Sequence, residues 1–387
     1  MGRATFAGIE IWRASFRLRL RFAHHSASRD RVETFLVGLR MADGCTGYGQ
    51  ALPRLYLTGE TLESVLDDIR NRYWPELRKL TFPGDGNPET VFSSLRALYL
   101  DANTRRSLAA WSALDVAAFS ALATRAGKSA AGEGHEKNGR TIPLVAVLPM
   151  TRPENVARLL GVLRLLGYRR FKVKVGRDEA MDAARLAAAR LAAGSGAWLA
   201  VDANGAWTWR ETLARREAFH RFGIALVEEP LRPEEAVSAD FTVLERELGL
   251  PVMADESLCS LSDARAILAR GSPAWWNLRL AKIGGFSGWR ELSRLAAERG
   301  IAVYGGILVG ETSLLAAAAR TIWPASGAVC GEYGFPRLFL AGDPFRGGPG
   351  GFRGCWTGDS GCRKGLGVRL SRRRLAQAAE LVWRDGE

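Results

Sequence analysis

Polar residues suited to proton transfer and metal binding recur at the ends of five short apolar runs. These residues are Lys172 and Lys174 in FKVKV, Asp202 and Asn204 in VDANG, Glu228 in LVEEP, Asp255 in MADES, and Lys282 in LRLAKIGG. The steps from 174 to 202, 202 to 228, 228 to 255 and 255 to 282 are 28, 26, 27 and 27 residues. Each step is long enough for one strand, one helix and their loops. In a parallel barrel, all these strand ends would meet at one mouth, where the active sites of that fold lie.

The residue types indicate metal-assisted removal of a proton. Three carboxylates from neighbouring strands form an all-oxygen site suited to Mg²⁺ or Mn²⁺, with positions left for water and substrate. A buried lysine can become a neutral amine and act as a base, whereas an arginine keeps its proton. Seven of the 54 basic residues are lysine, so a lysine inside a strand of this chain needs a specific reason.

Each of these residues also has an ordinary structural explanation. An acid at a strand end is more often a helix N-cap or an ion-pair partner. Lys172 and Lys174 lie two apart on one face of a strand, which in a peripheral strand is the solvent face. Lys282 could pair with the aspartate that follows the preceding strand. Their joint occurrence at regular spacing favours one shared site.

Strand and helix patterns divide the chain into two parts. Strand-like runs at 9–21, 32–41 and 46–52, with turns at 23–30 and 42–44, precede helical patterns at 61–77, 88–98 and 106–126. A polar, Gly-rich linker follows at 130–140. From residue 141, eight β-rich runs alternate with helical stretches such as 178–193 and 207–222, which predicts a (β/α) barrel. A doubly wound open sheet is the rival, but no GxGxxG or GxxxxGK[ST] motif follows any strand. The tail ends in a helix-like stretch at 370–383 that we expect to return to the N-terminal part.

Composition weighs against several function classes. The formal charge is +13, but the arginines are spread along the chain and no nucleic-acid-binding motif accompanies them, so we expect no nucleic acid as a partner. No run of 18 apolar residues is present, so we expect no membrane span. Residues 1–22 alternate arginine with apolar residues, which indicates a strand and not a signal peptide. Five cysteines without CxxC spacing favour reduced thiols in the cytoplasm.

The motifs KVKVG, VDANGAW, EEPL, MADES and NLRLAKIGG resemble those of the enolase superfamily, and within it the muconate-lactonizing subgroup. The resemblance covers essentially the whole chain and implies an α/β fold, a modified (β/α) TIM barrel with an α+β capping domain. The implied domains are a cap at 1–138, a barrel at 141–342 and a C-terminal segment at 343–387 that returns to the cap. The mandelate-racemase-type subgroup is excluded, because it needs a histidine late in the barrel and the four histidines all precede the sixth strand.

The resemblance also implies roles for the strand-end residues. Three of them match the ligands of Mg²⁺, with Mn²⁺ as an alternative: Asp202, Glu228 and Asp255. Lys174 and Lys282 match acid/base lysines on opposite faces of the substrate, and Lys172 matches a companion lysine that supports the enolate. The implied reaction is removal of the proton α to a carboxylate through an enediolate, as in a racemase, epimerase, cycloisomerase or lyase.

Several positions depart from the family pattern. Members of the subgroup often carry lysine where Arg279 stands. The dipeptide epimerases that the chain resembles carry an Asp-x-Asp motif near the eighth strand, and the corresponding CGEYGFPRLFLAGD lacks it, although Glu332 could serve. The neighbouring acids Glu229 and Glu256 are expected to point the other way along their strands.

The substrate and partners therefore remain expectations. Cap loops at 22–29 and 53–60 offer His24, Arg54 and Tyr56 to a small-molecule carboxylate, beside Asn204 from the barrel. We expect an N-acyl amino acid, or an unsaturated or cyclic carboxylate, with a dipeptide epimerase or an o-succinylbenzoate-synthase-like dehydratase as alternatives. A non-catalytic barrel protein is a more distant alternative. We also expect a homo-oligomer.

Overall fold

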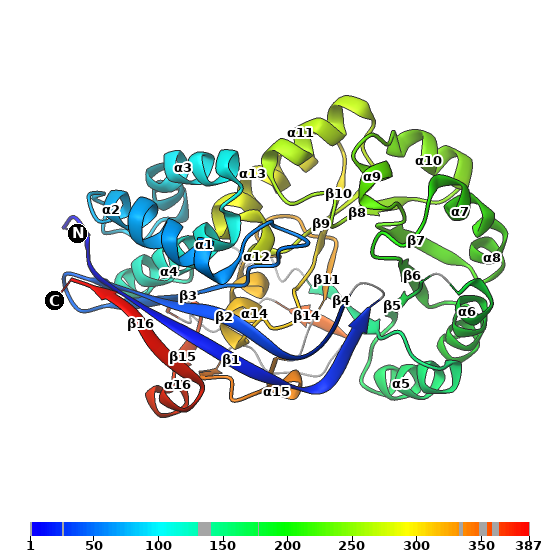
Figure 1. Ribbon diagram of the computed structural model, residues 1–387, viewed down its shortest axis with the longest axis horizontal. Coiled ribbons are helices and arrows are strands. Elements are labelled where there is room, and N and C mark those ends of the chain that lie inside the picture. Colours follow the sequence, from blue (N-terminus) through cyan, green and yellow to red (C-terminus); the bar gives the residue numbers. More distant parts are fainter. Residues whose placement is uncertain are drawn as a thin grey trace.

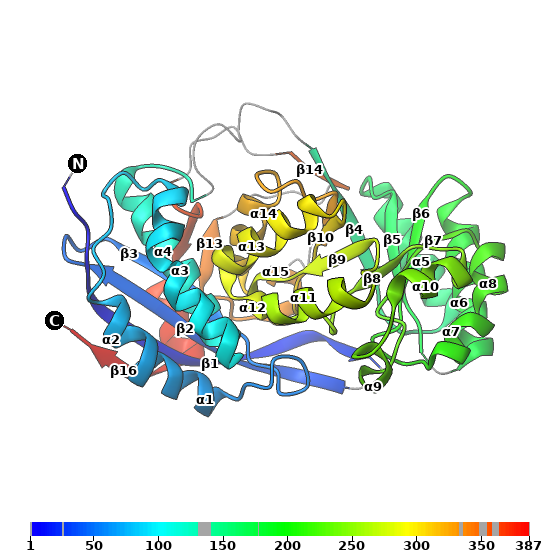
Figure 2. The ribbon, with the colours of Figure 1, turned by 90° about the horizontal axis from the view of Figure 1, so that it is seen from above.

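The computed structural model of the chain describes residues 2–24, 27–130, 141–176, 178–332, 336–347, 354–357 and 364–386. A cap of antiparallel strands and helices lies beside a ring of parallel strands surrounded by helices (Figure 1). Seen from above, the cap and the barrel lie side by side along the long axis of the molecule (Figure 2). No helix within the described ranges is long and apolar enough to cross a membrane.

Within the described residues, eight parallel strands form the ring of the barrel. They are β4 (Thr141–Leu148), β5 (Arg170–Lys174), β6 (Trp198–Asp202), β7 (Ile224–Glu228), β8 (Val252–Ala254), β9 (Trp275–Leu278), β10 (Ala302–Gly305) and β11 (Cys330–Glu332). Each strand pairs with the next in chain order, and β11 pairs with β4, which closes the ring. The predicted (β/α) barrel is therefore confirmed.

Helices connect these strands around the outside of the ring. They are α5 (Pro153–Leu165), α6 (Glu179–Ala193), α7 (Trp209–Ala214), α8 (Arg216–Arg221), α9 (Pro233–Ala236), α10 (Phe241–Leu248), α11 (Leu261–Arg270), α12 (Leu280–Ile283), α13 (Gly285–Glu298) and α14 (Ser313–Ile322). Capping side chains that accept a backbone hydrogen bond fix where α6, α7, α10 and α11 begin: Asp178, Thr208, Asp240 and Ser260. The stretch predicted as one helix at 207–222 is two helices, α7 and α8.

An apolar layer inside the barrel supports the strand-end residues. It consists of Val145, Ala200, Leu226, Met253, Tyr304 and Cys330, all buried. Successive side chains of a strand point to opposite faces, so the residues two positions further on point to the same inner side. These residues are Asp202 after Ala200, Glu228 after Leu226, Asp255 after Met253, and Glu332 after Cys330. The polar layer therefore lies one step closer to the carboxyl ends of the strands than the apolar layer.

The cap sheet combines strands that are far apart in the sequence. Its strands are β1 (Phe6–His24), β2 (Ala27–Met41) and β3 (Thr46–Ala51), joined by β12 (Leu340–Ala341) and β16 (Ala379–Asp385), which both pair with β1. The tail predicted as one helix at 370–383 is instead α16 (Arg372–Ala378) followed directly by β16. Pairing with β1 thus overrides the local helical pattern in the second half of that stretch.

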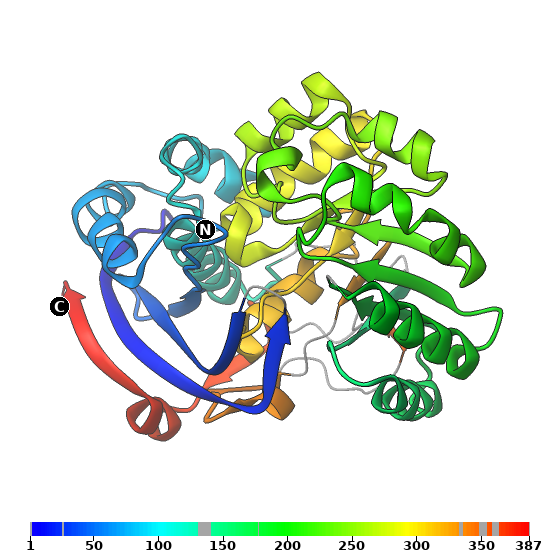
Figure 3. The same ribbon diagram turned by 45° about the vertical axis from the view of Figure 1, so that its right-hand side comes forward.

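The hairpin of β1 and β2 is longer than the sequence patterns indicate. The two strands pair from Phe6↔Met41 out to His24↔Ala27, so the predicted turn at 23–30 is too long: residues 23–24 and 27–30 belong to the strands. A register shift between Arg17 and Phe22 keeps the two strands paired beyond an irregular section. The hairpin extends from the cap towards the barrel (Figure 3).

Helices cover the cap sheet, and short strands link the C-terminal part to both domains. The cap helices are α1 (Leu62–Asp68), η1 (Ile69–Tyr73), α2 (Trp74–Leu77), α3 (Pro88–Arg105) and α4 (Leu108–Ala126). The C-terminal elements are α15 (Pro336–Phe339), β13 (Phe345–Gly347), β14 (Cys355–Thr357) and β15 (Val368–Leu370). β14 pairs with β4 of the barrel, whereas β16 pairs with the cap. The division at residues 138, 141 and 342 stays a prediction.

Helix α4 attaches the cap to the barrel through a buried carboxylate. It packs against α12 and α13 and is buried along most of its length. Asp115 of α4 accepts hydrogen bonds from the backbone N–H (3.1 Å) and the hydroxyl of Ser287 in α13, and burial raises its pKa to about 7. At a second contact, Gln50 of β3 donates to the Gly310 carbonyl (3.0 Å) and accepts from the Thr312 N–H (2.9 Å). The cap is therefore held to the barrel by buried polar contacts as well as by apolar packing.

Candidate active site

Five consecutive barrel strands bring their polar end residues to one mouth. Lys174 ends β5, Asp202 ends β6, Glu228 ends β7, Asp255 directly follows β8, and Arg279 directly follows β9. In the closed ring of eight described strands, β5 and β9 lie opposite each other. Lys174 and Arg279 therefore lie on opposite sides of the mouth, with the three carboxylates on the strands between them. All five residues are buried, with exposures between 0% and 8%.

Asn204 connects Lys174 to Glu256, a partly buried acid in the loop after β8. The Lys174 ammonium donates to Asp202 Oδ2 (3.0 Å) and to Asn204 Oδ1 (2.5 Å), and Asn204 Nδ2 donates to Glu256 Oε1 (3.1 Å). The φ of Asn204 is 47°, a left-handed conformation that asparagine tolerates better than most residues. Burial raises the pKa of Glu256 to about 8, and its Oε2 has no hydrogen-bond partner among the described residues. The expectation that Glu256 points away from the site is therefore wrong.

Lys172 lies one layer deeper than Lys174 and joins two carboxylates. Its ammonium lies 2.5 Å from Glu228 Oε2 and also contacts Glu332 at the end of β11. The Tyr304 hydroxyl donates to Glu332 Oε1 (3.1 Å). Burial alone would lower the pKa of Lys172, but the Glu228 and Glu332 carboxylates outweigh it and raise that pKa above the usual range. Lys172 is therefore a fixed positive charge, and the Glu332 carboxylate is already paired.

Two cations that follow β9 hold Asp255. The fully buried ammonium of Lys282 donates to Asp255 Oδ1 (2.7 Å) and to the Asp255 backbone oxygen (2.5 Å), and burial lowers the pKa of Lys282 to about 8. The Arg279 guanidinium contacts Asp255 Oδ2, and its Nη2 lies 3.5 Å from Glu228 Oε1. Arg279 lies two positions after Asn277, so its side chain points to the same inner side of the barrel. Lys282 lies about one helical turn later, in α12. Arg279 is thus the cation that follows β9 at the mouth.

Glu229 is a supporting acid that the sequence patterns miss. Its φ of 36° interrupts the alternation at the end of β7 and turns its side chain towards the β8 loop. There the carboxylate accepts from the Asp255 N–H (2.6 Å), the Ser257 N–H (3.2 Å) and the Ser257 hydroxyl (3.0 Å). Burial raises its pKa to about 7. The expectation that Glu229 points the other way along its strand is wrong, because this carboxylate turns towards the loop that carries Asp255 and holds it.

The strand-end carboxylates match the ligand chemistry of a divalent cation. They supply oxygen ligands alone, which suits a hard cation such as Mg²⁺. At Asp202 the effect of burial is outweighed by Lys174 and Lys172, which hold its pKa below the usual range, so this carboxylate is ready to bind a cation. Within the described ranges, however, no group of three or more acidic, histidine or cysteine side chains is arranged to hold an ion. The carboxylate oxygens are suitable ligands for Mg²⁺, but in this structure lysines and Arg279 bind those oxygens.

The cap residues predicted to contact the substrate differ in their burial and their partners. Arg54, which is 6% exposed, donates to the backbone oxygens of Pro53 (2.8 Å) and Val309 (2.9 Å), so it joins its cap loop to the loop after β10. Tyr56 is 52% exposed. His24 ends β1, but its side chain lies outside the described part of the chain. Contact of these residues with substrate stays a prediction.

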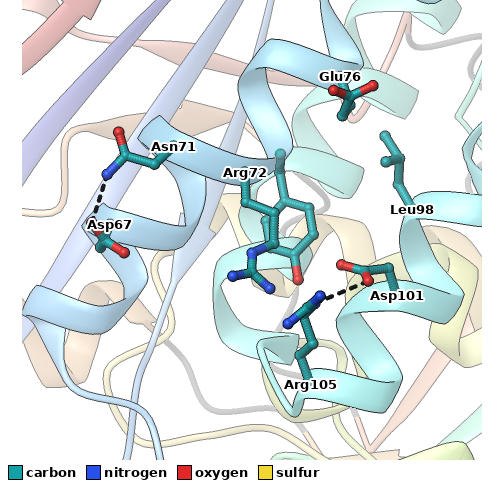
Figure 4. Close-up of a pocket in the computed structure, with 8 residues that line it drawn as sticks. Asp67, Asn71, Arg72, Glu76, Leu98, Asp101 and Arg105 are labelled. Atoms are coloured by element: carbon teal, nitrogen blue, oxygen red, sulfur yellow. Dashed lines mark hydrogen bonds and ion pairs between the residues drawn. The ribbon is translucent and has the colours of Figure 1, made fainter.

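A groove of about 410 Å³ lies among the cap helices and not at the barrel mouth. Its lining residues are Asp67, Asn71, Arg72, Tyr73, Glu76, Leu98, Asp101 and Arg105. Figure 4 shows Asn71 bonded to Asp67 and Arg105 bonded to Asp101, each four residues apart on a helix. Because no lining residue comes from a barrel strand, this groove is a feature of the cap surface.

Comparison with known proteins places the chain among relatives of one fold. The family model described as "Enolase C-terminal domain-like" matches residues 155–374. The L-Ala-D/L-Glu epimerase of Bacillus subtilis (strain 168) is 28% identical over 323 residues, which cover 82% of this chain and 84% of the relative. The crystal structure of N-succinyl Arg/Lys racemase from Bacillus cereus ATCC 14579 has a TM-score of 0.84 at 23% identity, over 98% of this chain and 99% of that one. A dipeptide epimerase from Enterococcus faecalis V583, complexed with Mg and L-Leu-L-Tyr, has a TM-score of 0.81 at 22% identity, over 94% and 99%.

Proposed function

This chain belongs to the enolase superfamily, and we propose that it is a divalent-metal-dependent enzyme that removes the proton next to the carboxylate of a small-molecule substrate. The observation that carries the proposal is the mouth, where Lys174 and Arg279 lie on opposite sides of Asp202, Glu228 and Asp255. Mg²⁺ is the proposed ion because a dipeptide epimerase of the same fold is complexed with Mg, and Mn²⁺ is the alternative. A racemase or epimerase is the proposed class because the compared relatives carry those names, with a cycloisomerase or lyase as alternatives.

Lys174 is the proposed base. A lysine can release and take back a proton, whereas an arginine cannot. Loss of the α-proton places a second negative charge on the substrate, and the fixed positive charges of Lys172 and Arg279 stabilise the resulting enediolate. A divalent cation, when bound, supplies further positive charge to the substrate carboxylate. Asn204 keeps the Lys174 amine in place through its side-chain oxygen.

Inversion of configuration needs a second group that transfers a proton on the opposite face, and Lys282 is the predicted one. Its ammonium is fully buried and bonded to two oxygens of Asp255, so it reaches a substrate only if that contact opens. Proton exchange therefore requires Lys174 alone, while racemisation also requires the release of Lys282. The two processes can be measured separately.

An N-acylated amino acid is the proposed substrate class, beside unsaturated or cyclic carboxylates. A free α-ammonium would need a carboxylate without another partner. Glu332 already contacts Lys172 and accepts from Tyr304, and Glu60 of the cap loop accepts from the Ala109 N–H (2.8 Å) at the start of α4. These engaged carboxylates favour a substrate without an exposed ammonium. A dipeptide epimerase is the runner-up because relatives of this chain carry that name.

The expected setting of the enzyme also stays a prediction. We expect it to act in the cytoplasm as a homo-oligomer, without nucleic-acid or membrane partners. Light scattering of the purified protein after gel filtration measures its oligomeric state.

Deuterium incorporation at the α-carbon tests the proposed reaction. A panel of N-acyl amino acids and a panel of L,L-dipeptides are incubated with the enzyme in D₂O, with and without Mg²⁺, and analysed by mass spectrometry. We expect Mg²⁺-dependent exchange in the N-acyl panel, which Lys174→Arg abolishes. Lys79→Arg is the matched control, because Lys79 is an exposed cap residue that pairs with Glu76. Exchange confined to dipeptides would select the runner-up, and no exchange in either panel would contradict both of these substrate classes.

A further inference from the structure

Arg279 lies where one guanidinium neutralises two carboxylates. Its Nη2 contacts Asp255 Oδ2 and lies 3.5 Å from Glu228 Oε1. Glu228 and Asp255 come from neighbouring strands, and both are fully buried. Two buried carboxylates this close need a positive charge between or beside them, because an uncompensated buried charge is strongly destabilising. In this structure Lys172 pairs with Glu228 and Lys282 pairs with Asp255, and Arg279 is the cation that the two carboxylates share.

The surroundings leave room for this side chain. Gly306, which follows β10, has no Cβ, and a Cβ built there would lie 2.8 Å from Arg279 Cγ. The amide of Asn277 donates to Glu228 Oε1 (2.7 Å) and so orients the carboxylate that Arg279 approaches. The position of the guanidinium is therefore set by the barrel and not by solvent.

We propose that Arg279 is an internal substitute for the divalent cation: it occupies the Glu228–Asp255 pair in the metal-free protein and withdraws when a cation binds there. The inference rests on the proposed function, because it takes these two carboxylates as metal ligands. A guanidinium and a divalent cation placed between the same two carboxylates repel each other, so the two compete. Metal affinity is then lower than the carboxylates alone would give, and the metal-free protein stays folded.

A third buried acid lies within the electrostatic reach of Arg279. Glu311, in the loop after β10, is 5% exposed, and its Oε1 accepts from the Leu308 N–H (2.9 Å). It lies close enough for the Arg279 charge to act on it: burial raises its pKa to about 8, and Arg279 opposes that rise.

Calorimetric titration of metal-stripped protein with Mn²⁺ tests the competition. Arg279→Met removes the guanidinium and one positive charge, and we expect Mn²⁺ affinity to rise on the order of 100-fold. Arg279→Lys keeps the charge, but a single ammonium replaces the fork that spans both carboxylates, and we expect a rise of about tenfold. Arg290→Met is the matched control, because it removes an arginine that pairs with Glu89 on the surface. We expect its Mn²⁺ affinity to equal that of the wild type.

Thermal unfolding in EDTA and in Mn²⁺ gives a second readout. Arg279→Met leaves two buried carboxylates without their shared partner, so it should melt at a lower temperature than the wild type in EDTA and recover in Mn²⁺. The wild type should change much less between the two conditions. A purely structural role for Arg279 would give a loss that Mn²⁺ does not restore.

The outcomes separate this inference from the proposed function. Equal Mn²⁺ affinity in the wild type and both Arg279 variants overturns the inference and leaves the metal-dependent reaction intact. A rise in Mn²⁺ affinity in Arg279→Met but not in Arg279→Lys also overturns the inference. Net charge, and not occupation of the carboxylate oxygens by the guanidinium, would then explain the effect. No Mn²⁺ binding by any of the proteins overturns both the inference and the metal-dependent part of the proposed function.

Discussion

Replacing Asp115 by asparagine tests how the cap is attached to the barrel. The Asp115 carboxylate on α4 is fully buried and accepts two hydrogen bonds from Ser287 at the start of α13. Burial raises its pKa from an ordinary value of 3.8 to about 7, because the charged form loses its contact with water. Asparagine keeps the size and one acceptor oxygen but does not titrate. The change therefore removes the ionisation together with one of the two acceptor oxygens.

The sign and size of the effect follow from the raised pKa. A group whose pKa is raised on folding contributes stability that is full below the unfolded pKa and is lost as the pH rises through the folded pKa. Above pH 5 the unfolded carboxyl is largely ionised, whereas the folded one keeps its proton until near pH 7. About two pH units at about 1.4 kcal/mol each give a loss of about 3 kcal/mol between pH 5 and pH 8.

Urea unfolding at pH 5 and pH 8, followed by tryptophan fluorescence, measures this loss. The free energy of unfolding of the wild type minus that of Asp115→Asn should fall by about 3 kcal/mol from pH 5 to pH 8. Taking the difference cancels the other buried acids, which titrate in both proteins. The dependence of this free energy on urea should be the same in both, so that the same unfolding process is compared. An equal pH dependence in the two proteins would refute the reasoning.

Two further changes test the mouth. Lys174→Arg keeps the positive charge but not the ability to transfer a proton, so α-proton exchange should disappear while circular dichroism stays that of the wild type; exchange at the wild-type rate would remove Lys174 as the base. Glu229→Gln leaves one of the donors from Asp255 and Ser257 without an acceptor, so we expect a loss of about 1–3 kcal/mol in thermal unfolding and roughly tenfold weaker Mn²⁺ binding in calorimetry. Unchanged Mn²⁺ affinity would show that Glu229 does not position Asp255.

The strand-end residues could be predicted because two simple periodicities place them. The regular step of one strand and one helix brings Lys174, Asp202, Glu228 and Asp255 to the same end of a parallel ring. The period of two within a strand then sets them all on the inner face. Neither inference needs the exact residue at which an element begins or ends, so both tolerate errors of a residue or two in the predicted boundaries.

The residues that were missed depend on such exact positions. Two cations follow β9, and the exact ends of the elements decide which of them faces the mouth. Because β9 ends at Leu278 and α12 begins at Leu280, Arg279 lies at the mouth and Lys282 is buried in α12. The orientation of Glu229 does not follow from its sequence position, because its own left-handed backbone conformation breaks the alternation of side chains along β7. The length of the β1–β2 hairpin is set by pairing between two strands, which no pattern within either strand reveals.

The pairing of β16 with β1 has a consequence for the order in which the chain assembles. These strands pair from Ile9↔Asp385 to Ala14↔Ala379, with a register shift between Ile11 and Trp12, and they lie nearly the whole chain apart. In the barrel, by contrast, each strand from β5 to β11 pairs with the strand before it in the chain. During synthesis the barrel can therefore grow unit by unit, while the cap sheet waits for its last strand. Until β16 is synthesised, the edge of β1 from Ile9 to Ala14 lacks this partner strand and can pair with another chain. The exposed arginines Arg17 and Arg19 continue this strand beyond Ala14, and their like charges discourage pairing with a second copy of the chain.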